Sequence, residues 1–199
     1  KLKFLAITSS NLDEFFMIRV AGLRHQKENG VKKRDIANMT PEEQLEGISD
    51  VCQKLVARQY RYLKVLLQEL ESEGLYFIHP DEASPEQKRW LEEYFEREIF
   101  PVVTPMAVDS SHPFPFLASK SLNLAMLLER NERDMTQDEE NDIDIKTAIV
   151  PVPSVLPRII RLPDNKDIPG RHDFIFLEQV IRYYATRFFI GYDLLEARP

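Results

Sequence analysis

The sequence predicts an α+β fold, in which an N-terminal long-helix bundle precedes an α+β head domain with a small, largely antiparallel sheet. Residues 41–73 carry apolar side chains at every third or fourth position, the period of an amphipathic helix. After Gly74 the pattern changes to short β-type runs, and prolines punctuate the chain that follows. We therefore expect a helical N-terminal domain over residues 1–75, truncated at its start, and an α+β head domain over residues 76–199, truncated at its end.

Two helices account for the N-terminal domain. Residues 11–28 have apolar spacings near three and four, with Ser10 and Asp13 as a start resembling a capping box and Gly30 as the end. The second helix has the stronger start, because Thr40 is followed by Pro41 and, three positions on, by Glu43. A helix of this length would reach roughly 50 Å at 1.5 Å per residue, and its single apolar seam predicts antiparallel packing against other long helices. The seam consists of Leu45, Ile48, Cys52, Leu55, Gln59, Tyr62, Leu66 and Leu70.

The head domain reads as short strands separated by helices. A β-type run at 75–78 precedes a helix that begins at Ser84 with a second cap. Strands are expected at 122–128 and 147–152, with a third at 159–162. An aromatic-rich helix over 174–189 would close the domain.

Composition excludes several classes of protein. The chain has 199 residues, 26 Lys and Arg against 33 Asp and Glu, and a net charge of −7. An acidic total argues against a dedicated nucleic-acid binder, because phosphate contacts need a surplus of Lys and Arg. The single cysteine, Cys52, excludes a disulfide framework and a cysteine zinc cluster. No apolar run approaches the roughly 18–20 residues of a membrane span, so we expect a cytoplasmic protein without a transmembrane segment.

Most of the negative charge lies in one segment. Residues 129–144 hold eight acidic and two basic side chains, a net of −6, while the other 183 residues sum to −1. The segment lacks the ligand spacing of a calcium loop, and its composition is typical of a solvated hairpin loop. The total charge therefore says little about the rest of the surface.

Catalytic and metal-binding motifs are absent from the sequence. There is no glycine-rich phosphate loop and no Gly-x-Ser-x-Gly elbow. Four histidines, His25, His79, His112 and His172, lie far apart without metal-type spacing. We expect no catalytic residue and no metal site in this chain, and His112 is the histidine most worth locating.

Two weaker signals concern nucleotide and phosphate. Asn11 is predicted at a helix start, where unpaired backbone N–H groups gather, and its amide suits the edge of a purine base; the alternative is a plain polar helix entry. Residues 19–34 hold six cations and one acid, Glu28. They form either a basic patch or cations that complement a helix C-terminus, and the residues alone leave both open.

Three segments resemble one family in the same order along the whole chain. Residues 4–20, which include Ser10-Asn11-Leu12-Asp13-Glu14-Phe15 and then Arg19, resemble the N-terminal region of bacterial polyphosphate kinases. The second segment includes Phe100-Pro101-Val102-Val103-Thr104-Pro105 and Ser111-His112-Pro113-Phe114-Pro115. The third runs from Val152-Pro153 to Arg161-Leu162-Pro163. Together these matches are specific.

The resemblance implies part of an enzyme that reversibly transfers the terminal phosphate of ATP to polyphosphate, with Mg²⁺, through a phosphohistidine. It implies that Asn11 contacts the adenine base of ATP or ADP, and that the head domain helps build a homodimer or homotetramer. The phosphorylated histidine and the Mg²⁺ residues would belong to C-terminal domains beyond this chain. None of the four histidines matches the family nucleophile, so His112 is expected to be a loop residue and the isolated chain to be inactive.

A reading from another class is a non-catalytic helical protein-interaction module. The long helices and the aromatic segment 174–189 would then bind a protein partner, and Asn11 would only be a cap. The two readings agree on the fold and differ on nucleotide binding.

Overall fold

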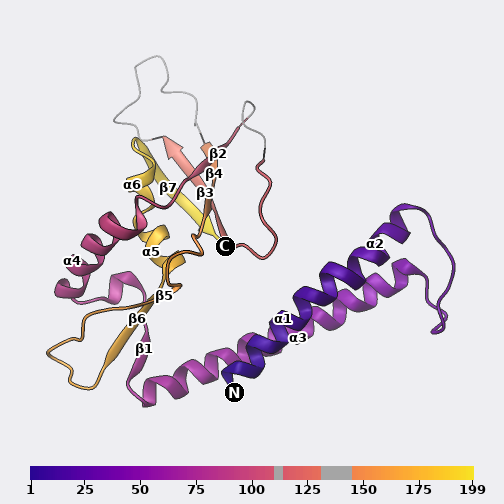
Figure 1. The fold of residues 1–199 in the computed structure, drawn as a ribbon, viewed down its shortest axis with the longest axis horizontal. Helices are drawn as coiled ribbons and strands as arrows, with labels where there is room; N and C mark the ends of the chain where they lie inside the picture. Colours follow the sequence, from indigo (N-terminus) through magenta and orange to yellow (C-terminus); the bar gives the residue numbers. More distant parts are fainter. Residues whose placement is uncertain (110–113, 131–144) are drawn as a thin grey trace. The chain divides into compact units, whose positions relative to one another are not determined.

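The computed structural model describes residues 1–109, 114–130 and 145–199. The described chain divides into two compact units, Lys1–Glu73 and Gly74–Pro199. Each unit is built around its own packed elements (Figure 1). Unit 1 is helical and unit 2 combines helices with two sheets, so the α+β prediction is confirmed.

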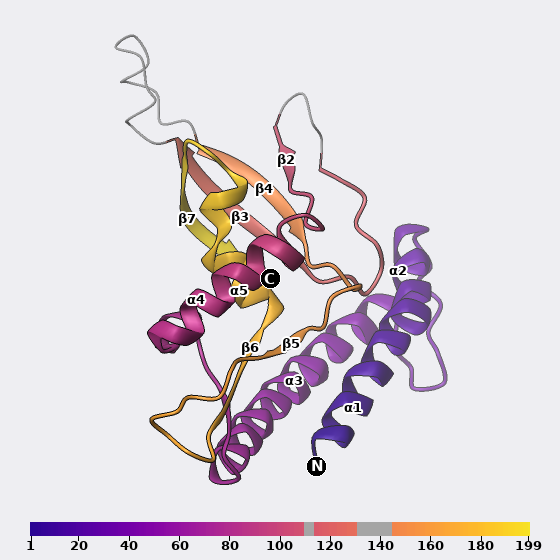
Figure 2. The same cartoon turned by 60° about the vertical axis from the view of Figure 1, so that its left-hand side comes forward.

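Unit 1 is a helical hairpin. Its first arm consists of α1 (Leu2–Phe15), one π-helical turn η1 (Phe16–Val20) and α2 (Ala21–Glu28). Its second arm is α3 (Pro41–Ser72), a helix of 32 residues. Figures 1 and 2 both show the first arm running along α3, and the predicted packing between long helices is confirmed.

The start of α3 is a complete capping box. The Thr40 hydroxyl accepts from Glu43 N at 3.3 Å, and the Glu43 carboxylate accepts from Thr40 N at 2.7 Å. These bonds satisfy two backbone N–H groups that a helix start would otherwise leave without a partner. The hydrogen bond from the Thr40 backbone is the main reason why the pKa of Glu43 lies below its usual value.

The predicted seam of α3 is correct in period and wrong at two positions. Leu66 is buried, and Gln59 is half-buried on the same face. Leu55 and Tyr62 are exposed, whereas Val56 and Leu63 are half-buried in their place. A step of three or four residues leaves such a choice open at each turn, and only the partner helix decides it.

The first arm differs more from its prediction. A helix was expected from residue 11, but α1 already spans Leu2–Phe15. The run Ser9-Ser10-Asn11 therefore lies inside a helix and not at its entry. Serine hydroxyls compete with backbone bonding and so favour caps, but here tertiary packing along α3 keeps the helix continuous through them.

Unit 2 contains two sheets. The three-stranded sheet has the order β1-β6-β5, from Leu75–Phe77, His172–Phe176 and Ile159–Arg161. In it β1 and β6 are parallel and β5 and β6 antiparallel. The four-stranded sheet has the order β2-β4-β3-β7, with every pair antiparallel (Figure 2). Its strands are Met106–Val108 (β2), Asn123–Arg130 (β3), Ile145–Pro151 (β4) and Tyr192–Arg198 (β7).

Short helices join these strands. They are η2, a 3₁₀ turn (Pro80–Glu82), α4 (Pro85–Tyr94), η3, a π-helical turn (Phe95–Ile99), α5 (Leu177–Tyr183) and α6 (Ala185–Phe188). The cap predicted at Ser84 is present, because its hydroxyl accepts from Gln87 N at 3.2 Å. One apolar core joins α4 and η3 to both sheets and α5. Its fully buried members are Leu91, Phe95, Ile99, Met126, Val150, Ile175, Leu177, Val180, Ile181 and Ala185.

The closing helix predicted over 174–189 is wrong in part. Residues 172–176 form β6, in which Asp173 and Ile175 are buried and the other three residues are half-buried. This alternation has the period of a strand, and the helical period starts only at Leu177. The strand β7 was not predicted. Residues 110–113, which include His112, and residues 131–144 of the acidic run lie outside the described residues. Of that run, Glu129 and Arg130 belong to β3.

Candidate functional site

Asn11 lies in the interior of α1 and not at its N-terminus. Its backbone N–H therefore belongs to the helical ladder, and the prediction of an anion-binding helix start at this residue is wrong. The side chain is exposed and forms no hydrogen bond with any residue that the structure describes. Its amide is free to donate and to accept, which is what an external ligand with both kinds of polar atom requires.

Apolar side chains surround Asn11 on the same face of α1. Phe4, Ile7, Asn11 and Phe15 follow one another at spacings of three, four and four residues, so they form one stripe along the helix. Phe4 is 74% exposed, Ile7 44% and Phe15 36%. A single polar amide inside an exposed apolar stripe offers hydrogen bonds at one point and apolar contact on both sides of it.

The rotation of this stripe is fixed by Gln59 of α3. The Gln59 amide donates to Leu5 O at 2.9 Å and to Ser9 Oγ at 2.6 Å. Gln59 was predicted as the polar exception in the seam, and these two bonds explain it, since a half-buried amide must find partners. At the end of the same contact, Lys1 Nζ lies 2.8 Å from a Glu69 carboxylate oxygen. The face of α1 that carries Asn11 is thereby turned away from Gln59.

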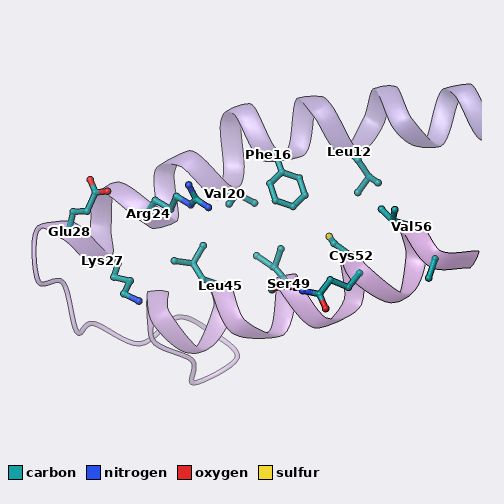
Figure 3. A pocket seen from close by; sticks show the side chains of 13 residues that line it. Leu12, Phe16, Val20, Arg24, Lys27, Glu28, Leu45, Ser49, Cys52 and Val56 are labelled. Atoms are coloured by element: carbon teal, nitrogen blue, oxygen red, sulfur yellow. Dashed lines mark hydrogen bonds between the residues drawn. The ribbon is translucent and has the colours of Figure 1, made fainter. Parts of the chain in front are cut away.

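A groove of about 990 Å³ opens between the two arms of unit 1 (Figure 3). Leu12, Phe16 and Val20 point from the first arm toward α3, where Cys52 and Val56 face them. Cys52 was expected as a small core residue, and it is half-buried in this groove. The sequence contained the signal for the groove as two facing apolar rows, but which turns remain open depends on packing.

The basic stretch 19–34 is divided between two roles. Lys27 lies in the last turn of α2 and pairs with Glu42 at 2.8 Å, an interaction that raises the pKa of Lys27. Arg34 pairs with Glu43 at 3.1 Å and tethers the connection between the arms. Arg24 lines the groove. The two cations that pair with α3 stabilise the hairpin, because each contacts a carboxylate in the first turn of α3.

The three described histidines all have local partners. His25 Nε2 lies 3.3 Å from Asn29 Nδ2, His79 Nδ1 lies 2.9 Å from Asp81, and His172 Nδ1 lies 2.8 Å from Asp164. The hydrogen bonds to Asp164 from His172 and Arg161 lower the pKa of that carboxyl group. These pairs hold turns and strand ends of the fold.

A buried polar network in unit 2 was not foreseen from the sequence. Asp173 is 2% exposed and accepts from Arg171 Nε at 2.7 Å and from Gln87 Nε2 at 2.9 Å. Gln87 also donates to Pro163 O at 2.9 Å, and the Arg171 guanidinium lies 4.3 Å from the centre of the Tyr76 ring. Every polar group named here has a partner, so the network fastens α4 to β6 and leaves no atom directed at a ligand.

In residues 1–109, 114–130 and 145–199, no three His, Cys, Asp or Glu side chains lie together in a way that could hold a metal ion. Within the same ranges, no helix combines the length and the apolar character that crossing a membrane requires.

Comparison with known families matches both units. Residues 1–78 match the model of the polyphosphate kinase N-terminal domain, and residues 86–199 match that of the polyphosphate kinase middle domain. A helical hairpin followed by a two-sheet α+β unit is thus an N-terminal and middle domain pair of one enzyme family. The chain belongs to the polyphosphate kinase family.

Individual relatives agree with this assignment. The polyphosphate kinase of Halalkalibacterium halodurans is 45% identical over 201 residues, which cover 100% of this chain and 27% of that protein. The polyphosphate kinase of Thermosynechococcus vestitus is 40% identical over 98% of this chain and 26% of its own length. The crystal structure of polyphosphate kinase from Porphyromonas gingivalis superposes with a TM-score of 0.81 at 27% identity, over 98% of this chain and 27% of that one. The chain thus spans about a quarter of the length of these relatives.

Proposed function

We propose that this chain is the nucleotide-contacting part of a polyphosphate kinase, which reversibly transfers the terminal phosphate of ATP to polyphosphate through a phosphohistidine. The family assignment over both units supports the activity. The observation that carries the role of this chain is the free, exposed amide of Asn11 in the apolar stripe of α1. ATP or ADP is the nucleotide, and polyphosphate is the second substrate.

The stripe suits a purine base for two reasons. The Asn11 amide can donate to one edge atom of adenine and accept from its exocyclic amino group. The Phe15 ring, one turn further along α1, offers an apolar surface against which a base can pack. In this proposal the chain binds and orients the base, and the reacting phosphate lies elsewhere.

The chemistry is assigned to the rest of the polypeptide. Transfer through histidine needs an oriented imidazole together with cations or a metal around the phosphoryl group. The described histidines are paired with local groups, and the described residues do not fit a Mg²⁺ site, because no cluster of three ligands forms among them. We infer that the phosphohistidine and the Mg²⁺ ligands lie outside the residues that the structure describes, as expected if they belong to C-terminal domains beyond this chain. A cytoplasmic location and assembly into a homodimer or homotetramer, with unit 2 as the contact, complete the proposal.

The test is the substitution Asn11→Ala in the full-length enzyme. Losing one hydrogen-bonding side chain should weaken ATP binding by about 2-fold to 10-fold, and the maximal rate should change less than the KM for ATP. The matched control is Gln68→Ala, which removes an exposed amide from α3. Unchanged ATP affinity in Asn11→Ala would remove the adenine role. In the same assay, the 199-residue chain alone should synthesise no polyphosphate, and measurable turnover by it would contradict the division of labour.

One observation favours the alternative of a helical protein-interaction module. Phe4, Met17 and Ile18 are 74%, 55% and 68% exposed on the first arm, which is a large apolar area for a free surface. Calorimetry with ATP separates the two functions. Heat that Asn11→Ala abolishes supports the nucleotide site, and the absence of any nucleotide effect in the full-length enzyme supports the module.

A further inference from the structure

The outer face of α3 carries an uninterrupted row of cations. Residues 51–68 include Lys54, Arg58, Arg61 and Lys64 and contain no Asp or Glu. All eighteen residues belong to one helix, and the four basic side chains are all exposed. We call these four residues the cationic row. The nearest acids along the helix are Asp50 before it and Glu69 after it, and Glu69 is already paired with Lys1 at 2.8 Å.

The spacing places the row on the side of α3 that faces away from the first arm. Its members follow at four, three and three residues, so neighbouring cations lie one helical turn apart. Gln59, which lies between two of its members, and Leu66, which follows the last one, face the first arm instead, because Gln59 bonds to Leu5 and Ser9 and Leu66 is buried. At 1.5 Å per residue, the row from Lys54 to Lys64 extends over about 15 Å.

The cationic row is not neutralised by the residues that the structure describes. No ion pair joins any of its members to a carboxylate in the ranges that the structure covers. Elsewhere in unit 1 cations do pair, as Lys1, Lys27 and Arg34 each contact a glutamate. Like charges one turn apart on a helix destabilise it. The row therefore costs stability that the hairpin does not recover from its own contacts, which is typical of a surface that meets an anion.

We propose that the cationic row binds inorganic polyphosphate, whose chain would run along α3. A single phosphate would engage one or two cations, whereas a linear polyanion can neutralise four that lie about one helical turn apart on one face of a helix. The Gln59–Ser9 bond places Arg58, the second member, at the axial level of the residues next to Asn11, so part of the row lies close to the level of the adenine contact. The inference rests on the proposed function for the choice of polyanion, and it assigns polyphosphate a contact on α3 of unit 1.

Salt dependence follows from this geometry. Each phosphate contact of an exposed cation releases a counterion. The logarithm of the binding constant therefore falls with the logarithm of the salt concentration, with a slope of about −0.7 per contact for single-stranded polyanions. Four contacts give a slope near −3 in a plot of log K against log salt concentration. Raising the salt from about 50 to about 200 mM should weaken binding by roughly 50-fold.

The experiment measures the affinity of the 199-residue chain for end-labelled polyphosphate by fluorescence anisotropy. The double variant Arg58→Gln/Arg61→Gln should bind on the order of tenfold more weakly and reduce the salt slope by about 1.4. The charge-retaining variant Arg58→Lys/Arg61→Lys should restore most of the affinity. The matched control is Lys32→Gln/Lys33→Gln, which removes two exposed cations of the same unit outside the row. Circular dichroism verifies that each variant remains helical.

Three outcomes would overturn the proposal. They are equal weakening by the control variant, no weakening by the row variant, and tighter binding of a single-stranded oligonucleotide than of polyphosphate at equal charge. The ATP affinity of the full-length enzyme distinguishes a failure of this proposal from a failure of the proposed nucleotide site. Row variants should leave it unchanged, whereas Asn11→Ala should lower it and leave polyphosphate binding intact.

Discussion

Replacing Gln87 by leucine tests the buried network that fastens α4 to β6. Gln87 is 2% exposed and donates both amide hydrogens, one to Asp173 Oδ2 and one to Pro163 O, each at 2.9 Å. In Gln87→Leu the Asp173 carboxylate loses a charged hydrogen bond, worth about 1.5–3 kcal/mol, and the Pro163 carbonyl loses its donor. The side chain also caps α4 through Ser84 N at 2.9 Å. We expect unit 2 to lose about 3–4 kcal/mol of unfolding free energy.

The assay is urea unfolding followed by the fluorescence of Trp90, the single tryptophan of the sequence. Trp90 lies on α4 three residues after Gln87 and stacks on Tyr94, with ring centres 5.1 Å apart, so it reports on unit 2. With a slope near 2 kcal/mol per molar urea, the midpoint should fall by about 1.5–2 M. Glu93→Leu, an exposed change on the same helix, is the control and should shift it little.

A double-mutant cycle with Asp173→Leu sharpens the result. Removing both partners eliminates the unsatisfied carboxylate, so the double variant should be less destabilised than the sum of the two single ones. Arg171 is 27% exposed at its side chain and can turn to water in the double variant. A loss below about 0.5 kcal/mol in Gln87→Leu, or strict additivity in the cycle, would refute the role assigned to the network.

Three further changes probe unit 2 and the first arm of unit 1. Burial, with Glu92 nearby, raises the pKa of Tyr184 from 10.0 to about 12, so the native state holds this proton more tightly; unfolding free energy should fall by about 1 kcal/mol between pH 10 and 12, after allowance for solvent screening. Tyr184→Phe should abolish that part of the decline, and an unaltered pH profile of stability would contradict the assignment. Gly74 has φ +80° and a Cβ there would lie 2.4 Å from Gly170 O, so Gly74→Ala should cost more than about 2 kcal/mol. Gly22→Ala, with open space around it, should instead stabilise its helix by up to about 1 kcal/mol, and a Gly74→Ala midpoint equal to wild type in thermal unfolding would disprove the strain.

Local signals in the sequence located the elements that begin with a strong cap. Thr40 and Ser84 each supply a hydroxyl, a following proline and a third residue that returns the hydrogen bond. Because all of these groups lie within four residues, the position at which the helix begins is determined locally. The strands β3 and β4 were likewise predictable, because each contains a short apolar run in the sequence; β3 alternates in burial, whereas residues 148–150 of β4 are all buried.

The errors lie where local and tertiary preferences conflict. Ser9, Ser10 and Asn11 favour a helix start when taken alone, but Gln59 from α3 binds Ser9 and the helix continues. Residues 174–176 were assigned to the start of an aromatic-rich helix, yet they belong to β6, which pairs with β1 and β5 across more than ten residues of sequence. A strand forms there because β1 and β5 lie on either side of it and supply its backbone hydrogen bonds. The periodicity of five residues cannot reveal these neighbours.

The sequence by itself determined the family, the α+β class and the residue types at the candidate site, because these follow from order and chemistry along the chain. Only the tertiary structure decided that Asn11 stands free on a helix face. It also decided that the cations of α3 align on the side away from its partner. The reason is geometric. Side chains point outward from a helix in all directions, and the neighbouring element against which the helix packs decides which of them stay exposed to solvent.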